Sequence, residues 1–174
     1  MLFRSDEWER YVRFLYETGS ITEHTQIWWS VRPHLMFPTV EIRICDAQPD
    51  VAEARSLAAL AYSLAARVAR ALDEGEPLPE LPNRLIEENL WRAIRYGLSG
   101  ELIDFERGTP VPARARLEQL LEWVRPVAEE LGAAVFLAIP ERNAAERQIR
   151  RYEEGASLQE IFSEQVRRQD HVHG

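Results

Sequence analysis

A carboxylate and two guanidinium groups are predicted to share one small surface between Ile27 and Asp46. The alternation of residues in this segment predicts two short strands joined by a turn that prolines bound. Strand side chains alternate between two faces, so Glu41 and Arg43 lie on the same face of the second strand. If the strands pair antiparallel with their polar faces aligned, Arg32 of the first strand joins them. A carboxylate can ligate a hard divalent cation and guanidinium groups can hold phosphate, so the pattern is typical of a metal–phosphate site.

The same side chains also admit a plainer interpretation. Glu-x-Arg is common in strands, and an ion pair on a solvated sheet surface is worth only about 0.2–1 kcal/mol. Arg32 can equally be an arginine at the end of a strand, and Asp46 a helix cap or an ion-pair partner. Spacing alone favours this ion-paired surface over a site.

A second polar group recurs at spacings of three in a predicted helix, at Asn89, Arg92 and Arg95. Residues three apart lie along one side of a helix. From the sequence pattern alone, its arginines are expected to pair with nearby acids such as Glu88.

Other polar residues carry weaker signals. Arg147 and Gln148 are expected on a solvated, charged helix face. His171 and His173 have a spacing that can bind metal on a strand, but the end of a chain more often frays.

The motifs around these residues resemble those of a known family. Residues 28–46 are similar to W-W-x-V-R-P followed by P-T-x-E-x-R-x-C-D, the signature of carboxylate–amine ligases related to glutamate–cysteine ligase, within the glutamine synthetase superfamily. Residues 88–97 resemble the family's E-N-x-W-x-A-x-R-Y-G, and residues 144–148 its weaker A-x-x-R-Q. Ser30 and His34 depart from the Asp and Ser that the family usually has.

The resemblance implies a ligase that uses ATP and Mg²⁺ to join a glutamate-like acid to an amino compound through an acyl phosphate. It implies that Glu41 ligates the metal and that Arg32 and Arg43 are catalytic and hold phosphate. It also implies three substrate-binding residues, Asn89, Arg92 and Arg95.

The resemblance covers only the C-terminal half of such a ligase. The N-terminal half would supply a Glu-rich first strand and an H-V-H strand. We therefore expect a ligase, or ligase subunit, whose other metal ligands come from a partner chain. The alternative is a non-catalytic fragment or subunit that acts by association.

Composition narrows the possible partners and chemistry. A chain of 174 residues is long enough for a single domain, 1–174, with one core. Its net charge of −8 argues against nucleic acid or an anionic membrane as the main partner. All 21 basic residues are arginine, which excludes Schiff-base and P-loop lysine chemistry. The single cysteine, Cys45, and the absence of an apolar signal segment predict a cytoplasmic protein.

Helical patterns dominate the elements that must position these residues. Helices are expected over 5–19, 50–75, 83–96, 143–152 and 158–168, with a further helix from 113 and a short strand over 101–106. We expect capping boxes at Asp50 with Glu53 and at Ser157 with Glu160. Asn83 is the expected cap of its helix.

Prolines set the remaining boundaries. Residues 76–82 and 109–112 are expected to be loops, and Pro126 to kink or restart its helix. The fold class is therefore α+β and helix-rich, with antiparallel strands packed against several helices. By resemblance it is the C-terminal half of a glutamine-synthetase-like catalytic domain.

The strands are too few to form a stable sheet by themselves. On the second strand Val40, Ile42 and Ile44 share the apolar face and must find a core. A two-stranded hairpin is marginal alone. We therefore expect a homo-oligomer, or a partner that supplies the N-terminal half, driven by the unpaired sheet edge.

Overall fold

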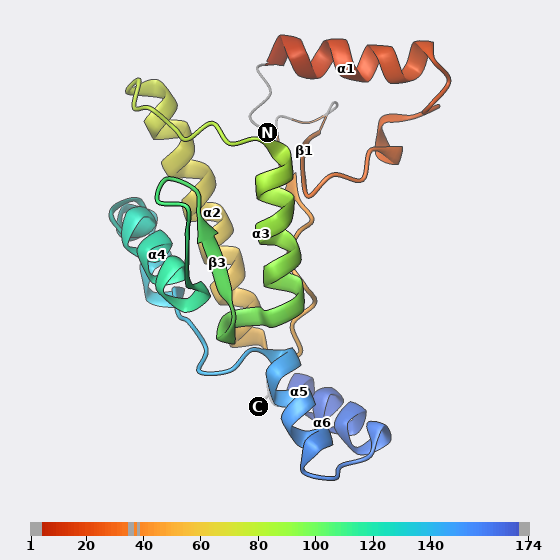
Figure 1. Cartoon of the computed structure of the whole chain (residues 1–174), viewed down its shortest axis with the longest axis vertical. Helices are drawn as coiled ribbons and strands as arrows, with labels where there is room; N and C mark the ends of the chain where they lie inside the picture. Colours follow the sequence, from red (N-terminus) through yellow and green to blue (C-terminus); the bar gives the residue numbers. More distant parts are fainter. Residues whose placement is uncertain (1–4, 35–36, 38, 171–174) are drawn as a thin grey trace. The chain divides into compact units, whose positions relative to one another are not determined.

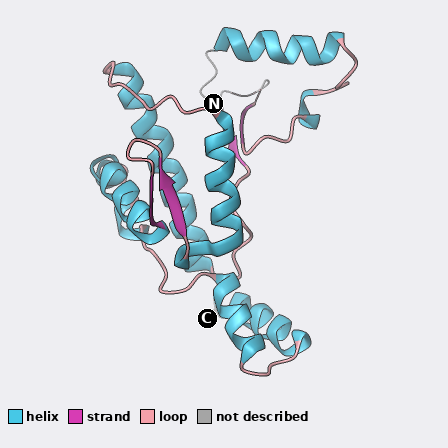
Figure 2. Ribbon diagram, viewed as in Figure 1, coloured by secondary structure: helices cyan, strands magenta, loops and turns pink. Residues whose placement is uncertain are grey.

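The computed structural model describes residues 5–34, 37 and 39–170. As predicted, the fold is helix-rich α+β: helices predominate (Figure 1), and the described strands form two short antiparallel hairpins (Figure 2). Contacts divide the chain into two compact units, Met1–Asp46 and Ala47–Gly174, here the N-terminal and the C-terminal unit. The predictions for His171 and His173 lie outside the described residues. None of the described helices has the length and apolar character that crossing a lipid bilayer requires.

The N-terminal unit is built on one amphipathic helix. Its elements are α1 (Ser5–Glu17), the 3-10 turn η1 (His24–Gln26), β1 (Val31–Pro33) and β2 (Val40–Ile42). Trp8 and Val12, one helical turn apart on α1, form a buried cluster with Ile21 and Ile27. Trp29 packs edge-on against Trp8, with 4.9 Å between ring centroids. This cluster fixes the segment that leads into β1 against α1.

The first hairpin pairs as expected, but its buried side chain is on the polar face. β1 and β2 are antiparallel with Arg32 opposite Glu41, which confirms the predicted pairing. The expectation that the apolar face finds a core is wrong for Val40 and Ile44, which are 60% and 52% exposed. The buried side chain is instead Arg32, because its guanidinium reaches carbonyl groups in the segment before β1.

The C-terminal unit contains most of the helices and the second hairpin. Its elements are α2 (Val51–Asp73), α3 (Asn83–Tyr96), η2 (Gly97–Ser99), β3 (Glu101–Asp104), β4 (Thr109–Pro112), α4 (Ala113–Glu130), η3 (Ala134–Phe136), α5 (Ala144–Glu153) and α6 (Leu158–Asp170). α2 packs along α4, where the small side chains of Ala59 and Ala128 let the helices approach. α3 packs against β3 (Figure 1).

Two proline-containing segments lie within regular elements. Residues 109–112, expected as a loop, form β4 and pair with β3, with Glu101 opposite Pro112. Both strands of a two-stranded sheet are edges, where proline is tolerated because its missing N–H can face solvent. α4 runs unbroken through Pro126. Pro126 is exposed, so the carbonyl group that loses its helical partner lies on the side open to water.

The helix caps follow prediction in part. Ser157 and Glu160 form the expected capping box at α6, with Ser157 N donating to Glu160 at 2.8 Å. At α2 Asp50 accepts from Ala52 N at 2.8 Å, but the predicted capping box is wrong because Glu53 pairs elsewhere. Asn83 was expected to cap α3, but it is the first helical residue and Pro82 takes the cap position.

Candidate functional site

Arg32 is the most constrained side chain of the first hairpin. It is 7% exposed, and its Nη1 donates to the carbonyl oxygens of Thr25 and Ile27, each at 2.9 Å. Its Nε donates to Glu41 Oε2 at 2.7 Å. A guanidinium held by three acceptors in a fixed fork cannot turn freely. Arg32 therefore determines where the Glu41 carboxylate lies.

Glu41 lies between two guanidinium groups. Its Oε1 accepts from Arg43 Nη1 at 2.7 Å, while its Oε2 accepts from Arg32. Partial desolvation would by itself raise the pKa of Glu41. The hydrogen bond and charge of Arg32, and then those of Arg43, outweigh that effect and hold the pKa below its ordinary value of 4.5. The carboxylate is therefore ionised at neutral pH.

Arg43 has a second contact besides Glu41. Its guanidinium carbon lies 4.9 Å from the centre of the Trp28 ring, a cation–π arrangement. Sequence reasoning found the three charged residues from the period of two but not this contact. A tryptophan in a predicted strand is more often a core residue, so its type gave no signal.

The hairpin offers more to an anion than to a bare metal ion. One carboxylate between two guanidinium groups leaves a net charge of +1, which favours phosphate oxygens. Mg²⁺ takes several oxygen ligands in near-octahedral geometry. Across residues 5–34, 37 and 39–170, no three His, Cys, Asp or Glu side chains gather where they could share a metal ion. Within these residues, Glu41 is thus not part of a preformed cluster of metal ligands.

The second group of predicted site residues lies in the C-terminal unit. Asn89 donates to the Ile103 carbonyl oxygen at 3.0 Å and accepts from Ile103 N at 2.8 Å, so its amide joins α3 to β3. Arg92 Nε donates to Glu88 at 2.9 Å, the helical pairing foreseen as the alternative. Arg95 is exposed, with its guanidinium 5.7 Å from the Tyr96 ring centre.

The expectation for Arg147 is wrong. Its two terminal nitrogens donate to both Glu53 oxygens at 2.6 and 2.7 Å, and the pair is partly buried. The hydrogen bonds that Arg147 donates to Glu53 raise the pKa of Arg147, which keeps the guanidinium charged. The two residues are 94 positions apart, so no local pattern could have indicated the pair.

The C-terminal unit also contains an apolar hollow of about 590 Å³ between α2, α4 and β3. Leucine is the commonest residue of its wall, at Leu57, Leu60, Leu98, Leu102, Leu117, Leu120 and Leu121. None of the six predicted site residues belongs to the wall.

Comparison with known proteins identifies the family. The model of the glutamate-cysteine ligase family 2 matches residues 1–174. The chain belongs to this family, which confirms the resemblance of its motifs.

Individual relatives agree with this assignment. One from Gloeobacter violaceus is 41% identical over 170 residues, 93% of this chain and 46% of the relative. One from Solibacter usitatus is 40% identical over 160 residues, 89% of this chain and 42% of the relative. Both carry the provisional name glutamate–cysteine ligase 2. The chain spans less than half the length of these curated relatives.

Proposed function

We propose that this chain is part of an ATP-dependent carboxylate–amine ligase that forms a γ-glutamyl amide, and that it is incomplete by itself. Family membership and the names of the relatives support the reaction class. The observation that carries the proposal is the Glu41 carboxylate held between Arg32 and Arg43 on a hairpin. The single exposed cysteine, Cys45, is compatible with a reducing cytoplasm as the place of action.

The proposed reaction has two steps. A carboxylate oxygen of the glutamate-like acid attacks the γ-phosphorus of ATP, the bond to the ADP oxygen breaks, and an acyl phosphate forms. The amine nitrogen then attacks the acyl carbon, phosphate leaves, and the nitrogen gives up a proton. The protein forms no covalent bond with the reactants in this reaction; it positions them and stabilises charge.

In this proposal the hairpin holds the phosphate groups. Arg32 and Arg43 bind phosphate oxygens and stabilise the charge that develops on the transferred group. Glu41 is a ligand of Mg²⁺, which when bound offsets phosphate charge. The substrate acid is bound by α3 residues, namely Asn89, Arg92 and Arg95.

The remaining carboxylate ligands come, in this proposal, from a partner. The partner is a second copy of the chain or a polypeptide that corresponds to the part of the relatives outside the match. The second candidate function is a non-catalytic subunit that acts by association. It is favoured by the exposed apolar side chains of the first hairpin, Val31, Val40 and Ile44.

Calorimetry of ATP binding with and without Mg²⁺ tests the proposal on the full chain, on Glu41→Ala and on Arg43→Ala. We expect Arg43→Ala to weaken binding about tenfold or more, because a charge-assisted hydrogen bond is lost. We expect Glu41→Ala to lose the Mg²⁺ dependence. Glu154→Ala and Arg150→Ala remove an exposed ion pair at the C-terminal end of α5 and serve as matched controls.

Two results would contradict the metal role or the ligase role. Tighter binding of ATP by Glu41→Ala in the absence of Mg²⁺, with no change in its presence, would mean that Glu41 only compensates the arginines. If the wild type does not bind ATP, the part of the Gloeobacter relative outside the match is added as a separate polypeptide and ADP release is measured. If no ADP is released, the ligase role is contradicted and the non-catalytic subunit function remains.

A further inference from the structure

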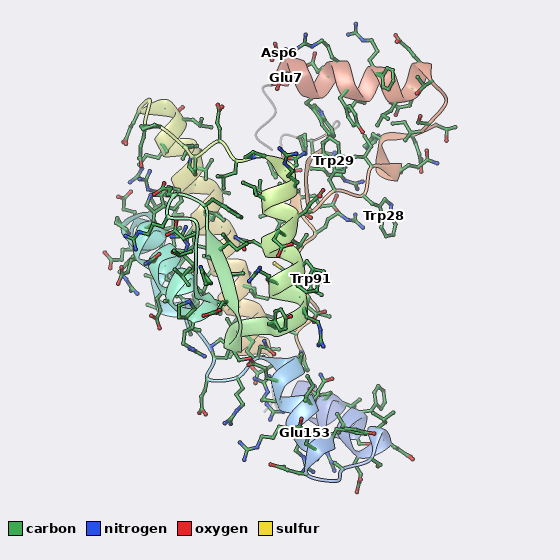
Figure 3. The ribbon with its side chains drawn as sticks, viewed as in Figure 1. Asp6, Glu7, Trp28, Trp29, Trp91 and Glu153 are labelled. Atoms are coloured by element: carbon green, nitrogen blue, oxygen red, sulfur yellow. The ribbon has the colours of Figure 1, made fainter. Side chains whose placement is uncertain are left out.

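Two adjacent tryptophans of the N-terminal unit have different surroundings. Trp29 packs on Trp8 and on Tyr11, with ring centroids 4.9 and 5.4 Å apart. Trp28 is 78% exposed and points away from α1 (Figure 3). The contact that Trp28 does make is with the Arg43 guanidinium. Trp28 therefore contributes little to the core and requires another explanation.

Arg43 and Arg32 are held in different ways. Arg32 is buried and bonded to three oxygens. Arg43 gives one Nη1 hydrogen bond to Glu41 and lies nearer the surface. A single hydrogen bond fixes one end of a guanidinium but leaves rotation about that bond. A flat ring beneath the group restricts that rotation, because the planar cation prefers to lie over the ring face.

Stacking on an aromatic ring does not compete with hydrogen bonding. The N–H groups of a guanidinium point outward in its plane, whereas the cation–π contact uses its face. Trp28 can therefore hold the plane of Arg43 while the edge of the group remains a donor surface. A rigid donor loses less conformational entropy when an anion binds.

We propose that Trp28 is a positioning residue for Arg43, holding its guanidinium so that Arg32 and Arg43 together bind one phosphate group of a nucleotide. This inference has two halves. The anion half, that the two arginines bind a phosphate group, rests on the proposed function. The positioning half, that Trp28 holds the Arg43 guanidinium, rests on the Trp28–Arg43 contact alone.

Nitrogen-15 NMR of the arginine side chains tests the positioning half without any ligand. In the wild type the Arg43 Nε–H signal is expected to show a ring-current shift and slow exchange with solvent. Trp28→Ala should abolish both, and Trp28→Phe should restore much of the slow exchange. An Arg43 signal that is the same in Trp28→Ala and in the wild type overturns the proposal.

Binding of inorganic triphosphate tests the anion half. Trp28→Ala is expected to weaken affinity about two- to fivefold, the range for an exposed cation–π contact. In the Arg43→Ala background the same change should have no further effect, since Trp28 acts through Arg43. Trp91→Ala, which removes another exposed tryptophan, is the matched control and should bind as the wild type does.

The two measurements separate the possible failures. An equal loss on Trp28→Ala with and without Arg43 would mean that Trp28 acts on the anion directly, which overturns the positioning role. If the wild type shows the Trp28-dependent NMR signature but no triphosphate affinity, the anion half fails together with the phosphate role in the proposed function. The positioning half is then confirmed for the hairpin alone.

Discussion

Glu41 shows how one carboxylate can hold two guanidinium groups together on a small surface. Both of its oxygens are hydrogen-bonded to guanidinium groups. It therefore fixes two cations 11 positions apart in one place and leaves one positive charge uncompensated. The period of two along a strand predicted that Glu41 and Arg43 are neighbours, and Arg32 followed on the condition of antiparallel pairing. The Trp28 contact was not predictable, because it depends on side-chain rotamers and not on periodicity.

The lowered pKa of Glu41 predicts a pH dependence. Its pKa is lower in the folded protein than in the unfolded chain, so the ion pairs stabilise the fold above the ordinary pKa of 4.5. That stabilisation is lost as the pH falls from 4.5 through the lowered folded value. Unfolding of the wild type and of Glu41→Gln, followed by the Trp29 indole signal, should differ at pH 7 and converge at lower pH. A difference that is constant from pH 7 to pH 3 would contradict this account.

At the scale of elements, local sequence patterns located most helices, but they did not show which faces of the elements are buried. The helical periodicity predicted α1, α2, α5 and α6 nearly to their ends. β4 was missed because its prolines at 110 and 112 suggested a loop, whereas an edge strand tolerates them. The buried face of the first hairpin was assigned wrongly because the acceptors for Arg32 lie in a turn outside the strands.

Asn89→Ala should loosen the contact between α3 and β3. Both hydrogen bonds to Ile103 are lost, and the backbone N–H and carbonyl of Ile103 then lack their partner. We expect the free energy of unfolding to fall by about 1–3 kcal/mol in urea denaturation. Gln159→Ala, an exposed amide on α6, should change it by less than about 0.5 kcal/mol. Unchanged stability of Asn89→Ala would instead leave its amide available mainly for substrate.

At the scale of the whole molecule, apolar surface remains uncovered. The first hairpin exposes Val31, Val40 and Ile44, and the C-terminal unit contains the leucine-walled hollow. Covering exposed apolar surface with a partner lowers the free energy, because that surface is removed from water. The small number of strands in the sequence led to the prediction that a partner chain covers the sheet. It could not show which face would be left open, since that depends on the burial of Arg32.

Sedimentation of the chain tests the predicted association. We expect the wild type to sediment as a species larger than the 20.2 kDa monomer at micromolar concentration. Val40→Glu with Ile44→Glu should shift it toward monomer without loss of helical circular dichroism, because both side chains are already exposed. Val135→Glu changes another exposed valine and should have no effect. A wild type that is monomeric over the whole concentration range would refute self-association.

The spacing of the stabilising contacts along the chain has a consequence for the order of folding. The core of the N-terminal unit joins residues 8–27, whereas the C-terminal unit is closed by Ser56 with Ala138 and by Glu53 with Arg147. Contacts between near neighbours in sequence form faster, because less chain entropy is lost in closing them. The unit that carries the arginine-held carboxylate can therefore fold while the ribosome is still making the rest. The helical unit cannot close until Arg147 has emerged.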